Sequence, residues 1–139
     1  MREIKFRAKD KNGNWAYGEL LRSEHDFVKG YDIITPEWGQ VKTVNEKTIG
    51  QYTGFKDING VEIYEGDVLK SAFNENPFGV VTWLEWGGYF FIDTSVIPIN
   101  WNSSYRPLGE MIDLKIDDKP INLEVIGNIY DNPTLFPKK

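Results

Sequence analysis

Four carboxylates lie close together in the middle of the 139-residue chain: Asp57, Glu62, Glu65 and Asp67. Carboxylates that converge in space could hold a divalent cation or act as an acid and base pair. Their spacing matches neither an EF-hand calcium loop nor the carboxylate pair of a glycosidase, and Asp commonly serves backbone turns. We therefore expect turn-forming residues here, and neither a metal site nor a catalytic pair.

The rest of the composition offers little for catalysis. The chain has no Cys, which excludes disulfides and zinc-thiolate sites, and a single His, His25, without a nucleophile and orienting partner. No Gly-rich loop leads into the Lys and Ser or Thr of a nucleotide-binding P-loop. The sequence predicts a protein that is not an enzyme and that takes no cofactor.

Aromatic and basic residues are the better candidates for binding. Exposed aromatic side chains bind peptides or stack on nucleic-acid bases, and a row of cations can meet phosphates. Core packing is the alternative for each aromatic residue, and a solvated strand face is the alternative for the cations. The candidate binding residues are Trp38, Trp86, Tyr89 and Trp101, in or beside loops, and Lys5, Arg7 and Lys9 on the first strand.

Short apolar or alternating runs separated by thirteen Gly and seven Pro predict an all-β fold, mainly antiparallel and with little helix. We expect an N-terminal β region over residues 1–60. It would pack on an SH3-like β-barrel over residues 61–139, and the two could form one compact unit. The barrel is an analogy of layout: a turn, a strand, a loop, a Gly-Gly hairpin and a closing strand.

The first hairpin should place the binding candidates on one face. Residues 2–10 alternate between apolar and charged side chains, which predicts a half-buried strand. A two-residue turn at residues 12–13, Asn-Gly, would place Ala8 opposite Tyr17. Tyr17 and Trp15 would then belong to the apolar face, opposite the cations.

Other segments carry further expectations. A hairpin turn at residues 57–60 and a second turn at residues 65–67 should join strand-like runs. Residues 22–26 read as a polar loop, residues 109–114 as a strand, and residues 123–130 as a strand that is central or covered. A single helical turn should follow Asn132.

The hairpin around residues 87–88, Gly-Gly, would place Leu84 opposite Phe91 and leaves both faces apolar. Small antiparallel sheets usually have one solvent-exposed face. This hairpin is therefore expected either between two layers of the same chain or against another subunit.

Three blocks resemble the YopX family of phage and prophage proteins in order and spacing: MREIKFRAKD, TIGQYTGFKDINGVEIYEGDVL and LEVIGNIYDNPTLF. The resemblance implies a β-rich protein of bacterial viruses or integrated prophages. It brings no agreed catalytic residues that could be carried over. Where the family usually has Trp after Phe-Arg-Ala, this chain has Lys9.

These observations together favour a non-catalytic module that binds a host or phage protein or assembles with itself. A nucleic-acid-binding β-barrel is the alternative, against which the net charge of −5 argues. No stretch has the length of a signal peptide or membrane span, so we expect no membrane partner and a place in the bacterial host cytosol.

Overall fold

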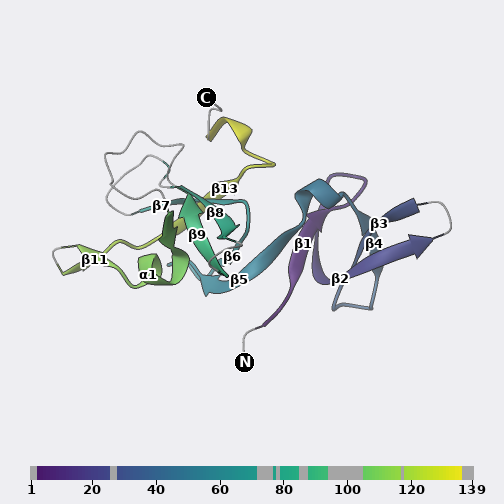
Figure 1. Ribbon diagram of the computed structural model, residues 1–139, viewed down its shortest axis with the longest axis horizontal. Coiled ribbons are helices and arrows are strands. Elements are labelled where there is room, and N and C mark those ends of the chain that lie inside the picture. The colour runs from purple at the N-terminus through teal and green to yellow at the C-terminus, as the bar shows by residue number, and fades with distance from the viewer. Residues whose placement is uncertain are drawn as a thin grey trace. The chain divides into compact units, whose positions relative to one another are not determined.

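The computed structural model describes residues 3–25, 28–71, 77, 79–84, 88–93, 105–116 and 118–135 (Figure 1). Trp86 and Trp101 lie outside the described residues, as does the side chain of Tyr89. The all-β prediction is confirmed, because antiparallel strands make up most of the described chain. The chain divides into two compact units, residues 1–54 and 55–139. Whether these units fold independently is a separate property, so the predicted division after residue 60 stays a prediction.

The first unit is built from four strands and the start of a fifth, in the hydrogen-bonded order β4-β3-β2-β1-β5. Asp10, just after β1, forms an isolated antiparallel β-bridge with Val44 at the end of β4. The end of β4 therefore lies beside the end of β1. Ala8, Ala16 and Ile33 are buried with Val44 in a small core. The elements are β1 (Phe6–Lys9), β2 (Trp15–His25), β3 (Val28–Ile34), β4 (Val41–Val44), the 3-10 turn η1 (Glu46–Thr48) and β5 (Gly50–Lys56).

The register of the first hairpin differs by one residue from the prediction. Ala8 lies opposite Ala16, and Arg7 lies opposite Tyr17. A shift of one residue moves a side chain to the other face of the sheet. Tyr17 therefore shares the face of the cations, and 43% of its surface is exposed.

The length of the connecting loop causes this shift. The backbone N–H of Asp10 donates to the carbonyl of Asn14 at 2.8 Å, which leaves three residues between them. The Asp10 carboxylate accepts from the N–H groups of Asn12 and Asn14, and Gly13 adopts a φ of +80°. A three-residue loop with Gly in the left-handed conformation is the hairpin type that inserts one extra residue. The predicted two-residue turn was wrong for this reason.

The second unit contains a five-stranded antiparallel sheet in the order β10-β9-β8-β7-β13. Its core includes Leu69, Val81 and Ile92 from the sheet and Leu108 and Met111 from the helix, all buried. The strand order keeps the meander on which the SH3-like analogy rested, while closure into a barrel stays a prediction. The elements are β6 (Glu62–Tyr64), β7 (Asp67–Lys70), β8 (Gly79–Leu84), β9 (Tyr89–Asp93), β10 (Tyr105–Pro107), α1 (Leu108–Ile112), β11 (Lys115–Ile116), β12 (Lys119–Pro120), β13 (Glu124–Asn128) and the 3-10 turn η2 (Pro133–Leu135).

Three local predictions are corrected. The strand β2 continues through His25, so the segment from residue 22 to 25 is strand and not loop, because it pairs along its length with β3. Residues 108–112 form α1, not a strand, since Leu108 and Met111 are three residues apart and both enter the core beside β9 and β10 (Figure 1).

In the hairpin of β8 and β9, Leu84 lies opposite Tyr89 rather than Phe91. The longer loop shifts the pairing by two residues and keeps the faces unchanged. The helical turn after Asn132 is confirmed as η2.

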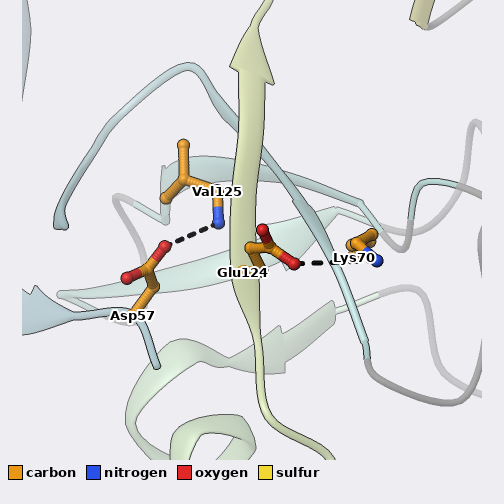
Figure 2. Close-up of polar contacts among 4 residues, drawn as sticks. All are labelled: Asp57, Lys70, Glu124 and Val125. Atoms are coloured by element: carbon orange, nitrogen blue, oxygen red, sulfur yellow. Dashed lines mark hydrogen bonds and ion pairs between the residues drawn. The ribbon is translucent and has the colours of Figure 1, made fainter. Parts of the chain in front are cut away.

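The two central turns are confirmed. The turn at residues 57–60 connects β5 to β6, with Gly60 at a φ of +80°, and the turn at Gly66, with a φ of +88°, precedes β7. The edge strand β13 meets the first of these turns, since the Val125 N–H donates to the Asp57 carboxylate at 2.9 Å (Figure 2). The strand β13 lies at the edge of its sheet and its side chains are mostly half-buried, so the predicted central position is wrong. The turn shields part of this otherwise open edge.

Candidate aromatic binding site

The central carboxylates hold the backbone. One Asp57 oxygen accepts from the N–H groups of Asn59 and Val61, at 2.8 and 2.9 Å, and the other accepts from Val125. Asp67 is buried and accepts from the Tyr64 N–H at 2.8 Å. These contacts confirm the turn-forming role of Asp57 and Asp67, and for Glu62 and Glu65 it stays a prediction. Within the described ranges, no group of three or more His, Asp or Glu side chains converges as metal ligands would.

The predicted basic residues alternate along β1 and the residue just before it, and each covers an aromatic ring. The Lys5 ammonium lies 5.1 Å from the centroid of the Tyr52 ring. Arg7 and Lys9 share the Trp15 ring, at 4.6 and 5.4 Å from its centroid. A cation over an aromatic face gains about 0.5–1 kcal/mol at exposed sites. The strand thus presents a face of cations seated on rings, with Arg7 only 6% exposed.

Trp38 belongs to the tight loop of the β3–β4 hairpin (Figure 1). The loop is closed by the Thr35 N–H, which donates to the Gln40 carbonyl at 2.8 Å. Trp38 has a φ of +66° and 94% of its surface is exposed. The left-handed conformation disfavours a bulky side chain, and an exposed ring contributes no burial, so this Trp does not stabilise the fold.

The loop and the first hairpin enclose a hollow of about 400 Å³, which we call the aromatic hollow. Its lining combines aromatic and apolar residues with four polar side chains. The first group is Trp15, Ala16, Tyr17, Pro36 and Trp38, and the second is Thr35, Glu37, Gln40 and Lys42. Flat rings on a concave surface, with polar groups beside them, are typical of surfaces that bind peptides.

A second hollow of about 500 Å³ lies beside the first and shares Thr35 and Pro36 with it. We call it the acidic hollow, because Glu3 and Glu19 line it together with Lys5. Gly18 at its floor lies against the Ile34 carbonyl, and a Cβ there would collide with that oxygen. Glycine at this position is what lets the β3–β4 loop approach β2 so closely.

Three of the predicted binding residues therefore lie around Trp15. Arg7 and Lys9 cover the Trp15 ring, and Trp38 lines the same hollow as Trp15. Lys5 faces the neighbouring hollow, and the Tyr89 backbone belongs to the second unit. The sequence analysis missed Trp15 and Tyr17, because the one-residue register difference placed them in the core. The available signal was Asp10, whose side chain selects the longer turn.

The fold and the site together define an all-β protein of two compact units, with an aromatic hollow and a cation-lined strand face in the first. The chain belongs to the YopX family: the family model, described as YopX protein, matches residues 5–137. This confirms the resemblance found in the sequence.

Among solved structures, the crystal structure of protein EF1440 from Enterococcus faecalis is similar, with a TM-score of 0.57. The two chains are 23% identical, and the match covers 99% of this chain and 100% of the other. At that identity the likeness shows the fold alone. No curated protein matches the chain in sequence. Throughout the described ranges, helices lack the length and apolar character that crossing a bilayer requires.

Proposed function

We propose that this YopX-family chain is a non-catalytic protein-binding module that holds its partner in the aromatic hollow. The observation that carries the proposal is Trp38, which is almost fully exposed and stands in a backbone conformation that Trp disfavours. Residues in strained conformations that lower the stability of the fold are commonly found at functional sites. The phage or prophage setting and the bacterial cytosol are part of this proposal and rest on the family resemblance.

Binding of another protein is favoured here over self-assembly. The sequence argument for a second copy was the hairpin of β8 and β9, apolar on both faces. Val81 and Ile92 on one face of this sheet are buried within the single chain, and so are Val68 and Leu84 on the other. These four residues are buried without a further subunit, and Trp83 on the same hairpin is partly exposed, at 36%.

Nucleic-acid binding has weaker support. Residues 1–54 carry nine Lys or Arg and eight Asp or Glu, a net charge of +1, and residues 55–139 carry seven and thirteen, a net charge of −6. Binding to a phosphate backbone needs a concentrated positive field. Lys42 lines the hollow, but Glu37 lines it too and offsets that charge, and Arg7 over the Trp15 ring is buried.

The test is capture of a partner by the full-length chain from nuclease-treated lysate of infected or induced host cells, followed by mass spectrometry. Trp38→Asn should reduce capture at least tenfold, while Trp83→Phe, in the second unit, should leave it unchanged. Capture that survives Trp38→Asn would place the binding surface elsewhere. Capture abolished by nuclease would favour the nucleic-acid alternative, and sedimentation of the purified chain measures self-association separately.

Trp38→Asn also makes a prediction about stability. Asn tolerates the left-handed conformation better than Trp, and the exposed ring contributes no buried area. We expect the variant to be about 0.5–1 kcal/mol more stable than the natural chain. Urea denaturation followed by circular dichroism measures this change. A clear loss of stability would show that the ring supports the fold, and the proposal would lose its main argument.

A further inference from the structure

The two hollows form adjacent compartments along one loop. Both are lined by Thr35 and Pro36. The aromatic residues lie on one side with Glu37 and Lys42, whose formal charges offset each other, and Glu3 and Glu19 lie on the other side with Lys5. A ligand that crosses this loop would therefore meet flat rings first and negative charge next. Such an arrangement suits an extended chain more than a compact small molecule.

The aromatic hollow has the chemistry that recognises proline. Prolines in an extended segment adopt the polyproline II conformation, which has no internal hydrogen bonds and leaves its carbonyls open to donors. Grooves lined by aromatic rings bind such segments, because the preformed helix loses little entropy. Here Trp15, Tyr17 and Trp38 supply the rings, and the Trp38 indole and the Gln40 amide bring hydrogen-bond donors to the same lining.

The acidic hollow has the charge that recognises a cation. Its charged lining residues are Glu3, Glu19 and Lys5, a formal charge of −1, and the Lys5 ammonium lies 3.4 Å from the Glu3 carboxylate. Glu19 is exposed on β2. Complementary charge sets the register and specificity of a bound segment more than its affinity. A basic side chain entering this hollow would meet Glu19.

Resting on the proposed binding function, we infer that the first unit recognises an extended proline-rich segment with a basic residue beside the prolines. The prolines lie against the rings of the aromatic hollow, and the basic side chain enters the acidic hollow. A single-stranded nucleic acid suits this surface less well. Its phosphates would meet Glu37 on one side and Glu3 and Glu19 on the other.

The probe is a short synthetic peptide, blocked at both ends, in which one arginine adjoins a run of prolines, prepared with the arginine at either end. Two matched peptides replace the prolines by alanine or the arginine by glutamate. Binding to the full-length chain is measured by fluorescence anisotropy of the labelled peptides. We expect one orientation of the arginine peptide to bind, the alanine peptide to bind at least tenfold more weakly, and the glutamate peptide to bind more weakly than its parent.

Two variants locate the contact. Trp38→Asn should weaken binding of the arginine peptide at least tenfold, which is about 1.4 kcal/mol. Glu19→Lys should weaken the arginine peptide and strengthen the glutamate peptide, a reversal that simple unfolding would not produce. Trp83→Phe, in the second unit, should change neither.

Equal binding of the proline and alanine peptides, an unchanged preference in Glu19→Lys, or tighter binding of a single-stranded oligonucleotide that displaces the peptide would overturn the inference. Failure of every peptide would also overturn it. If Trp38-dependent capture from lysate persisted in that case, the protein-binding proposal would stand and only the chemistry of the partner would be wrong.

Discussion

The chain contains the same five-residue turn twice, as DKNGN at residues 10–14 and DINGV at residues 57–61. In each, the Asp carboxylate accepts from the N–H groups two and four residues later, and the Asp carbonyl accepts from the Gly N–H at 3.0 Å. Gly13 and Gly60 both have a φ of +80°. The local sequence alone is therefore sufficient to specify this turn.

The two turns differ in their role in the fold. In the second unit, the second carboxylate oxygen of Asp57 accepts from Val125, 68 residues further along the chain, and Asp57 is 8% exposed. The Ile58 N–H adds a bond to the Leu123 carbonyl at 3.1 Å. The turn at Asp10 instead sets the register that brings Trp15 and Tyr17 to the binding face. One motif thus anchors an edge strand in one unit and arranges a surface in the other.

The largest expected effect separates the two Asp residues. Asp57→Asn keeps one accepting oxygen but presents an amide donor to the Val125 N–H, so a partly buried donor loses its acceptor. We expect a loss of about 1–3 kcal/mol in the free energy of unfolding. Asp10→Asn should change it by less than about 0.5 kcal/mol, because Asn forms the same local turn. Urea denaturation of both variants measures the difference, and equal losses would contradict the anchoring role of Asp57.

The sequence predicted the elements whose signals are local. Asn-Gly at residues 59–60 and Gly66 marked the central turns, because few residues other than glycine adopt positive φ easily. The strict alternation of residues 4–9 marked the first strand and its row of cations. The side of the sheet taken by Trp15 was predicted wrongly, because the Asn-Gly pair alone fits loops of two and of three residues, and the Asp10 side chain that selects the longer loop was not considered.

Contacts between segments far apart in the chain could not be predicted from the sequence. Nothing around Asp57 or Val125 indicates that they meet, since their hydrogen bond depends on where β13 enters the sheet. The helix α1 is too short to show a helical period, and it contains Gly109, a poor helix former. Its burial of Leu108 and Met111 is a tertiary effect that overrides the local preference. The hollow beside Trp38 likewise depends on the close approach of β2 and the β3–β4 loop.

Substitution of the two turn glycines should produce equal effects. No atom lies within 4 Å of a Cβ built on Gly13 or Gly60, so alanine meets no steric obstacle at either position. The penalty then comes only from the left-handed backbone, about 1–2 kcal/mol in each case. Denaturation of Gly13→Ala and Gly60→Ala under the same conditions tests this equality. A much larger loss in one variant would show that the turns are not equivalent even locally.

The smallest expected effect concerns the ion pair that lies beside the Asp57 anchor. The Glu124 carboxylate lies 3.6 Å from the Lys70 ammonium, across the pairing of β13 and β7 (Figure 2). Both side chains are partly exposed, and water screens such pairs, so Glu124→Gln should change the free energy of unfolding by about 0.2–1 kcal/mol. The effect should shrink further in high salt, whereas that of Asp57→Asn should persist, because the Asp57 bond is a partly buried hydrogen bond to a neutral N–H. If Glu124→Gln destabilised the chain as much as Asp57→Asn, the edge strand would be held by charge and not by the turn.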